Sequence, residues 1–230
     1  MYSHNDIVIV GDSWCAERSN YDHWPKLLYS ELTNDDQNMP RGKGYSGCAW
    51  WTVRKRLLAE FKLSIPKLVI ICHTDYSRIP NDNDIPITIN GAFIAAKRSQ
   101  FTIDNTIYKA ATSYYTHLYS KNFHLWAQQQ WYHELDSTLA YHNIEKVIHL
   151  FGFPPEGKMH LFRAGLTVKD PLTRYITPND NRNKWDNHLT PEDNNRLALA
   201  LLEIIKNYPE GGGLYDKQIM DGGNDNYKNY

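Results

Sequence analysis

Three side chains in this sequence of 230 residues have the chemistry that hydrolysis through a covalent intermediate requires. The first is Ser13, which follows the β-branched run Ile7–Val10 and a Gly-Asp pair. The others are His188 and Asp186, in a polar stretch near the other end of the chain. A serine hydroxyl attacks a carbonyl carbon when an imidazole accepts its proton and a carboxylate orients that imidazole. The attack also needs N–H donors for the oxyanion, and Gly47, in a loop with several glycines, is a candidate donor.

Each of these residues also has a purely structural interpretation. Ser13 would serve as the N-cap of a helix, and Gly47 as a turn glycine with positive φ. His188 and Asp186 are also typical of a solvated loop. Taken singly, the residues leave both interpretations open, and the elements that position them carry the rest of the evidence.

The elements around these residues alternate between strands and helices. Apolar runs predict buried strands over residues 7–10, 67–72 and 146–151, with very short strands before the 42–47 loop and at 175–176. Apolar residues at helical spacing predict helices over 24–33, 50–61, 107–141 with a break near 120–123, and 191–208 with Thr190 as N-cap. This alternation predicts an α/β domain over residues 1–208, with three layers, α/β/α, around a mostly parallel sheet. Residues 209–230 are rich in Gly, Asn, Asp and Lys, which predicts an extended C-terminal tail.

The candidate residues lie where ligand sites form in such a sheet, at the carboxyl ends of the strands. Ser13 follows the first strand, and we expect the N-terminus of the next helix beside its hydroxyl. The block His73–Asp75 follows the second long strand, and His188 lies in the loop before the last helix. We therefore expect a serine, a glycine loop, a polar cluster and an Asp/His pair on one rim of the sheet.

The order of these blocks resembles that of the SGNH (GDSL-type) hydrolase family. The resemblance spans residues 6–207, and the blocks that carry it are Gly11-Asp12-Ser13, Gly47, His73-Thr74-Asp75 and the pair Asp186/His188. It implies a flavodoxin-like three-layer fold and the hydrolysis of an acyl or acetyl ester, often on a sugar or a lipid. It also implies roles for four residues: Ser13 as nucleophile and oxyanion donor, Gly47 as second oxyanion donor, and His188 as the base that Asp186 orients.

Two positions depart from the family pattern. Thr74 stands where the family has an asparagine as third oxyanion donor, so the Thr74 hydroxyl or the neighbouring His73 would supply that hydrogen bond. Asp186 precedes His188 by two residues instead of three, and a main-chain carbonyl is the alternative partner of the base, as in members with a Ser-His dyad. These departures leave a second hypothesis open. The chain would then be a weakly active or inactive protein of SGNH fold, with a structural or binding role in a virion or another assembly.

Two further residues near the third block are candidates for substrate binding, Asp75 and Arg78. Arg78 would either bind a carboxylate or phosphate of the substrate or form an ion pair with Asp75. The segment from Tyr76 to Asn105 follows directly. A connection of this length is typical of a lid or a partner contact, so it is the best candidate for what sets substrate choice.

The cysteines and the aromatic residues each have a packing interpretation. Cys15, Cys48 and Cys72 lie within two residues of the site blocks but lack the spacing of metal-ligand pairs, so we expect them to pack beneath the site and predict no metal and no cofactor. The aromatic residues between Tyr114 and Tyr132 recur at helical spacing. That spacing is more typical of a core or an oligomer face than of a carbohydrate platform.

The composition indicates which partners to expect. The formal charge is −1, which predicts neither nucleic acid nor a membrane surface as a partner. The sequence has no signal-peptide or transmembrane pattern and only three cysteines, so the expected location is the cytoplasm. The His73–Asp75 block also resembles that of SGNH-type proteins encoded by bacteriophages, for which the location would be the virion. The expected partners are an ester such as an acylated sugar, and a second copy or an assembly partner in contact with the tail.

Overall fold

The computed structural model describes residues 1–16, 22–81, 87–92, 105–156, 159–175, 189–210 and 213–215. Six strands in these ranges form one sheet in which every neighbouring pair is parallel. They are β1 (Ile7–Asp12), β2 (Gly44–Tyr45), β3 (Leu68–His73), β4 (Lys146–Phe151), β5 (Leu166–Val168) and β6 (Gly213–Tyr215). Their order in space is β2-β1-β3-β4-β5-β6, which is the flavodoxin-like order with β6 added beyond β5. The expected α/β fold with a parallel sheet is therefore confirmed.

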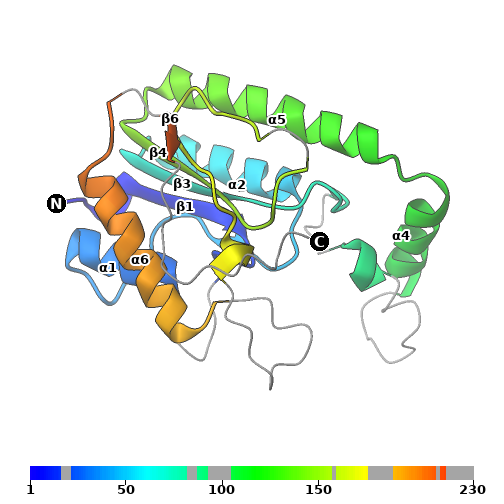
Figure 1. Ribbon diagram of the computed structural model, residues 1–230, viewed down its shortest axis with the longest axis horizontal. Coiled ribbons are helices and arrows are strands. Elements are labelled where there is room, and N and C mark those ends of the chain that lie inside the picture. The colour runs from blue at the N-terminus through cyan, green and yellow to red at the C-terminus, as the bar shows by residue number, and fades with distance from the viewer. Residues whose placement is uncertain are drawn as a thin grey trace.

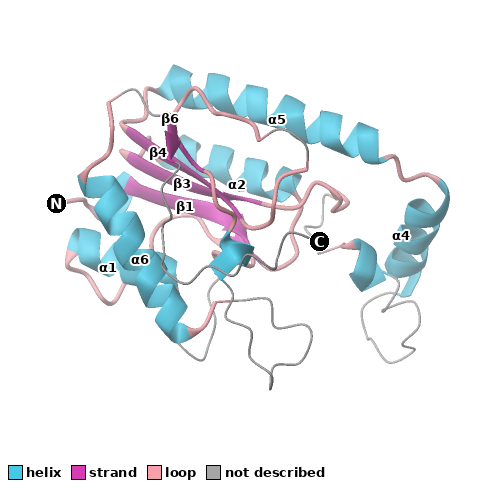
Figure 2. Cartoon of the chain, in the orientation of Figure 1, coloured by secondary structure: helices cyan, strands magenta, loops and turns pink. Residues whose placement is uncertain are grey.

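Helices cover both faces of this sheet, as Figures 1 and 2 show. They are α1 (Trp24–Thr33), α2 (Trp50–Leu63), α4 (Asn105–His117), α5 (Lys121–His142) and α6 (Pro191–Lys206), with short 3-10 helices at His4–Asp6 and Leu172–Tyr175. Helices α1 and α6 pack against one face, and α2 and α5 against the other. Helix α4 lies away from the sheet, beyond the N-terminal end of α5 (Figure 1).

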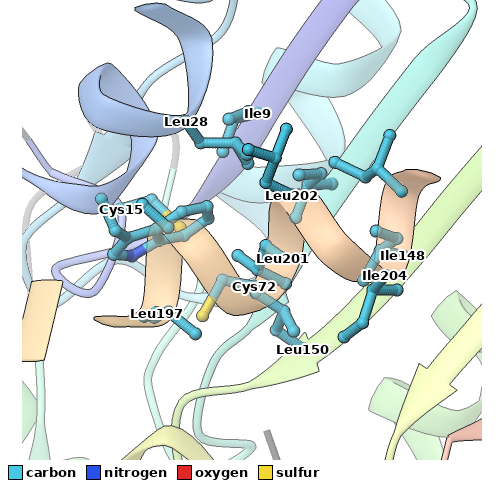
Figure 3. Packing of buried hydrophobic residues seen from close by; sticks show 14 of the residues in the cluster. Ile9, Cys15, Leu28, Cys72, Ile148, Leu150, Leu197, Leu201, Leu202 and Ile204 are labelled. Carbon is cyan, nitrogen blue, oxygen red and sulfur yellow. The ribbon is translucent and has the colours of Figure 1, made fainter. Parts of the chain in front are cut away.

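The hydrophobic core has two halves because successive side chains of a strand point to opposite faces. In β1, Ile7 and Ile9 pack in the half that α1 and α6 cover, while Val8 and Val10 pack in the half that α2 and α5 cover. Figure 3 shows the first half, in which Leu197, Leu201 and Leu202 of α6 lie beside Leu28 and Ile9 and beside Cys72, Ile148 and Leu150 of the inner strands. A strand with both faces buried is mostly apolar, as Ile7–Val10 and Leu68–Cys72 are, whereas buried His149 interrupts the apolar run of β4.

The helix boundaries follow from local signals that the sequence contains. Helix α1 has the predicted bounds, and the long helical region is broken at residues 118–120. Ser120 is the N-cap of α5 and accepts a hydrogen bond from the Phe123 N–H. Thr190 caps α6 as predicted, since its hydroxyl oxygen accepts from the Asp193 N–H at 3.1 Å.

One expected strand is absent at Tyr175, and two observed strands were not predicted. Tyr175 ends the 3-10 helix Leu172–Tyr175 instead of opening a strand, and residue 176 lies outside the described part of the chain. The strand that follows β4 is β5, only three residues long. Within the expected tail, residues 213–215 form β6 and pair with β5, while residues 216–230 lie outside the described ranges.

From Ile79 onward, the described apolar residues of the 76–105 segment pack against α4. Ile87 and Ala92 are buried together with Ala111 of α4, and Ile79 packs at their edge. Residues 82–86 and 93–104 lie outside the described ranges. Among the aromatic residues of α5, Trp131 and Tyr132 are in the core, whereas Phe123 and Trp126 are each 56% exposed.

Candidate active site at the carboxyl ends of β1 and β3

Ser13 lies in a tight turn at the carboxyl end of β1, where the chain leaves the sheet. The Cys15 N–H donates to the Asp12 carbonyl at 3.1 Å, and the Ala16 N–H donates to the Ser13 carbonyl at 3.4 Å. The side chain of Asp12 accepts a further hydrogen bond from the Trp14 N–H at 3.1 Å. The capping side chain of this turn is therefore Asp12 and not Ser13, so the structure gives no support to an N-cap role for the serine.

Helix α1, the next described helix after Ser13, begins where the sequence predicts, eleven residues beyond the serine. Helix α1 begins at Trp24 with His23 as N-cap, so no described helix N-terminus directly follows Ser13. Ser13 itself is 8% exposed. Within the described residues, neither its hydroxyl nor its backbone N–H makes a hydrogen bond, which leaves both groups available to a substrate.

The turn packs directly against β2 because Gly44 has no side chain. A Cβ at Gly44 would lie 2.3 Å from the Cys15 carbonyl carbon and 2.4 Å from the Asp12 carbonyl oxygen. Both atoms belong to the backbone of the turn, so no side-chain rotation could relieve the overlap. Gly44 thus sets how closely β2 and the Ser13 turn approach each other.

We predict that Gly44→Ala displaces the Ser13 turn and lowers the stability of the fold. Forcing a methyl group into a packed site typically costs about 1–3 kcal/mol, and a displacement of about 1 Å in a catalytic group can cost about 10²-fold in rate. Urea unfolding measures the first effect. The matched control is Gly91→Ala, whose Cβ would meet only the Thr88 side chain. Equal stability of the two variants would show that the close approach of β2 is not required.

A buried ion pair ties the turn to the third block. The Arg78 guanidinium lies 3.0 Å from the Asp12 carboxylate, with both side chains almost fully buried. Arg78 also donates to the Cys48 carbonyl at 2.9 Å, and the Thr74 hydroxyl donates to the same carbonyl at 2.9 Å. The residues beside Ser13, beside Gly47 and after β3 therefore meet in one network.

This network corrects the expected role of Arg78. Its ion-pair partner is Asp12 and not Asp75. Because Arg78 is only 5% exposed and its guanidinium is engaged twice, it is not placed to bind a substrate carboxylate or phosphate. Burial raises the pKa of Asp12, and the Arg78 guanidinium, the Trp14 N–H and the Thr74 hydroxyl oppose that rise.

Gly47 has the backbone conformation that its residue type suggested. Its φ is +71°, in the left-handed region that glycine adopts most readily. The Cys48 N–H closes the loop by donating to the Tyr45 carbonyl at 3.2 Å, and Thr74 and Arg78 fix the Cys48 carbonyl. Within the described residues the Gly47 N–H donates no hydrogen bond, as an oxyanion donor requires before substrate binds.

The structure does not support a third oxyanion donor from Thr74 or His73. The hydroxyl of Thr74 has one proton, for which the Cys48 carbonyl and the Asp12 carboxylate compete. The imidazole of His73 lies between the sheet and α5, stacked on Phe162 with 4.9 Å between ring centroids. Strand alternation accounts for this placement, because His73 shares a face with Val69 and Ile71 of β3.

His73 instead belongs to a buried histidine pair. Its Nε2 lies 3.1 Å from Nδ1 of His149, and Nε2 of His149 lies 3.0 Å from the Ala164 carbonyl oxygen. Because a carbonyl only accepts, His149 carries its proton on Nε2, and His73 Nε2–H then donates to His149 Nδ1. Burial lowers the pKa of both imidazoles, that of His149 to about 4, so both are neutral at pH 7.

We predict from this pair that the free energy of unfolding falls as the pH drops below about 6.5. The unfolded chain takes up a proton on each histidine near its ordinary pKa of 6.5, whereas folded His149 does so only near 4. The stabilisation is therefore complete above 6.5 and is lost between 6.5 and 4, at about 1.4 kcal/mol per pH unit for each histidine. Urea unfolding at pH 7.5, 6.5 and 5.5 measures the slope. Exposed His117→Gln should leave the slope unchanged, and equal stability at all three pH values would contradict the prediction.

The two remaining catalytic candidates, His188 and Asp186, lie outside the described residues. The residue that follows His188 is described: Leu189 is 4% exposed and packs in the core half that contains Trp14. Its carbonyl accepts a hydrogen bond from the Asn194 side chain at 3.2 Å. The chain is therefore anchored one residue after His188.

Further hydrogen bonds connect Asn194 to the turn that contains Ser13. The Asn194 side-chain oxygen accepts from the Trp24 N–H at 3.0 Å. The indole Nε1 of Trp24 donates to the Trp14 carbonyl at 2.7 Å, and Trp14 is the residue after Ser13. These buried hydrogen bonds thus connect Leu189, at the end of the loop before α6, to the turn that contains Ser13. None of these side chains could be picked out from the sequence, because tryptophan and asparagine at helix starts have no distinctive spacing.

A hollow of about 410 Å³ lies at the carboxyl ends of β3 and β4. It is lined by Thr74, Asp75, Tyr76, Gln128, Tyr132, Phe151, Phe153, Pro154, Pro155 and Glu156. Phe153 joins the hollow to the serine turn, since its ring contacts Trp14 edge-on at 6.1 Å and lies 5.2 Å from the Arg78 guanidinium carbon. Asp75 therefore lies in a substrate-sized cavity, as its expected role in substrate binding requires, whereas Gln128, Phe153 and Glu156 were not predicted.

The three cysteines cluster beneath the turn. An ideal Cβ on Gly11 would lie 2.7 Å from Cys72 Cβ and 2.8 Å from Cys15 Sγ, and Cys48 Sγ lies 3.6 Å from the Gly11 carbonyl oxygen. Burial raises the pKa of Cys48 to about 12 and raises that of Cys72 as well, so these sulfurs remain thiols that pack against the glycine. Among the described residues, no group of three or more His, Cys, Asp or Glu side chains is arranged to hold a metal ion.

No helix in the described ranges has the length and apolar character needed to cross a membrane. Comparison with models of known protein families, with curated proteins and with solved structures finds no match to this chain.

Proposed function

We propose that this chain is a serine ester hydrolase of the SGNH type, with Ser13 as nucleophile and His188 as base. The observation that carries the proposal is the chain of buried hydrogen bonds from Leu189 through Asn194 and Trp24 to the Trp14 carbonyl. It anchors the residue after His188 near the residue after Ser13, although 174 positions separate His188 from Trp14 in the sequence. The flavodoxin-like strand order supports the proposal. In such sheets ligands bind at the point where the strand order reverses, which here lies between β1 and β3.

The reaction would proceed in two steps. The Ser13 hydroxyl oxygen attacks the ester carbonyl carbon while His188 accepts the hydroxyl proton, and the N–H groups of Ser13 and Gly47 bind the resulting oxyanion. The alcohol then leaves with the proton from His188, and the acyl group remains on Ser13. Water, deprotonated by His188, attacks the acyl-enzyme and releases the acid. Asp186 or a main-chain carbonyl would orient His188.

One observation favours the alternative, a weakly active or inactive protein of the same fold with a binding role. Thr74 stands where the family has its third oxyanion donor, and its single hydroxyl proton is already engaged within the Asp12–Arg78–Cys48 network. Loss of one oxyanion donor typically costs about 10²–10³ in rate. The proposed enzyme would thus use two backbone donors and be slower than a three-donor enzyme.

Labelling with a fluorophosphonate probe tests the proposal, because the probe forms a covalent bond only with an activated serine. We expect a mass increase of one probe per chain, located on Ser13 by peptide mapping. His188→Gln should slow the labelling strongly, while His117→Gln, on exposed α4, should leave it unchanged. A folded protein that remains unlabelled over hours would favour the binding role instead.

A further inference from the structure

The hollow at the carboxyl ends of β3 and β4 contains an acidic group, Asp75, without a compensating charge. One oxygen of Asp75 accepts the Ser77 N–H at 2.6 Å, and the other makes no hydrogen bond to a described residue. No described cation pairs with Asp75: nearby Arg78 is bound to Asp12, and Lys121 is bound to Glu156 at 2.6 Å. The cavity therefore has a net negative charge at its Asp75 side.

The walls around this carboxylate are aromatic. Tyr76, Tyr132 and Phe153 line the same cavity as Asp75. The Tyr76 hydroxyl donates to Glu156 at 3.3 Å, which holds its ring at the cavity wall. Burial raises the pKa of Tyr76 and Tyr132, and the nearby charge of Asp75 adds to the rise in both, after that of Glu156 in the case of Tyr76.

We propose that this cavity binds a positively charged amine or quaternary ammonium group of the ester substrate. A carboxylate supplies the opposite charge, and the faces of aromatic rings attract a desolvated cation within about 6 Å of their centroids. A volume of about 410 Å³ accommodates a trimethylammonium group together with the short chain that links it to an ester. A substrate phosphate or carboxylate would instead meet the unpaired charge of Asp75.

The position of the cavity relative to the serine fits an ester that spans both. Phe153 contacts Trp14, the residue after Ser13, and also lines the cavity. A cation held between Asp75 and these rings would leave the ester carbonyl to extend toward the carboxyl end of β1. This inference rests on the proposed esterase function for its catalytic half, whereas cation binding itself does not require catalysis.

Two esters of equal shape test the charge preference. Acetylcholine and 3,3-dimethylbutyl acetate differ in one atom, a positively charged nitrogen in place of a carbon. We expect kcat/KM to be at least tenfold higher for acetylcholine, and Asp75→Asn to reduce this ratio to near one. Asparagine keeps the acceptor for the Ser77 N–H, so the variant removes charge without removing the turn. Glu31→Gln, which removes an exposed carboxylate from α1, is the matched control and should keep the wild-type ratio.

A binding measurement separates this inference from the esterase proposal. Isothermal titration of the Ser13→Ala variant with choline should show saturable binding that Asp75→Asn abolishes. Choline binding without turnover of either ester would support the cation site and contradict the esterase function. Turnover of both esters at equal kcat/KM, with no choline binding, would overturn the cation site and leave the esterase function standing.

Discussion

Replacing Ser13 with alanine is expected to lower kcat for hydrolysis of p-nitrophenyl acetate by a factor of about 10⁴–10⁶, because the acyl-enzyme can no longer form. KM should change little, since the backbone N–H groups of Ser13 and Gly47 remain. Stability should also change little, because the Ser13 hydroxyl has no hydrogen-bond partner within the described residues. Initial rates and thermal unfolding of the same preparation measure both quantities.

The control for this variant is Ser137→Ala, which removes an exposed hydroxyl from α5. It should keep the wild-type rate and the wild-type unfolding temperature. A Ser13→Ala protein that retains a tenth or more of the wild-type kcat would contradict nucleophilic catalysis by this serine. Because the comparison is made on folded variants, it separates a chemical role from a structural one.

Removing the guanidinium of Arg78 is expected to have the largest effect on stability. Arg78→Met would leave the Asp12 carboxylate buried without its partner, which typically costs about 3–5 kcal/mol. It would also remove one of the two hydrogen bonds to the Cys48 carbonyl and leave the loop that carries Gly47 held there by the Thr74 hydroxyl alone. Urea unfolding at pH 8 measures the loss, and the esterase rate should fall with it even under conditions where the variant is folded.

The matched control is Arg54→Met, which breaks the exposed ion pair between Arg54 of α2 and Glu134 of α5. Exposed pairs contribute about 0–1 kcal/mol, so this variant should remain close to wild type. A second comparison uses Asp12→Asn together with Arg78→Met, which removes both charges and should recover part of the lost stability. Equal losses in the free energy of unfolding for Arg78→Met and Arg54→Met would show that burial does not increase the contribution of the Asp12–Arg78 pair to stability.

The Arg78→Met variant should also depend on pH in a defined direction. Asp12 in the unfolded chain ionises near 3.8, whereas burial raises its pKa in the folded state. Ionisation of Asp12 therefore opposes folding, and without Arg78 that opposition is stronger. Relative to wild type, the variant should therefore lose stability as the pH rises from about 4 toward neutrality. A difference in the free energy of unfolding between variant and wild type that stays constant with pH would contradict this prediction.

Helices and strands that depend on neighbouring residues could be predicted from the sequence. The long apolar runs predicted β1, β3 and β4, and the bounds of α1 and the caps of α5 and α6 follow from neighbouring residues. Strands β5 and β6 were missed because three residues are too few to establish a pattern. Their positions depend on pairing with partners that lie far away in the sequence.

The same distinction applies to the site. Ser13 at a strand end and the positive φ of Gly47 were predictable, because each depends on a few neighbouring residues. The partner of Arg78 was not, since Asp12 is 66 positions away and Asp75 only three. Strand alternation places His73 on the buried face of Val69 and Ile71, but the family pattern made His73, together with Thr74, a candidate oxyanion donor.

Strand β6 determines which strand lies at one edge of the sheet, where another polypeptide could pair. It pairs along the whole of β5, and without it the buried strand Leu166–Val168 would present unpaired N–H and C=O groups at the rim. A parallel strand left open in this way is a template on which another polypeptide can add itself. With β6 in place, the outer strand at this side of the described sheet is β6, in which Gly213 and Leu214 are exposed. Ending the chain at Tyr208 would instead leave the edge of the buried strand β5 open to strand addition.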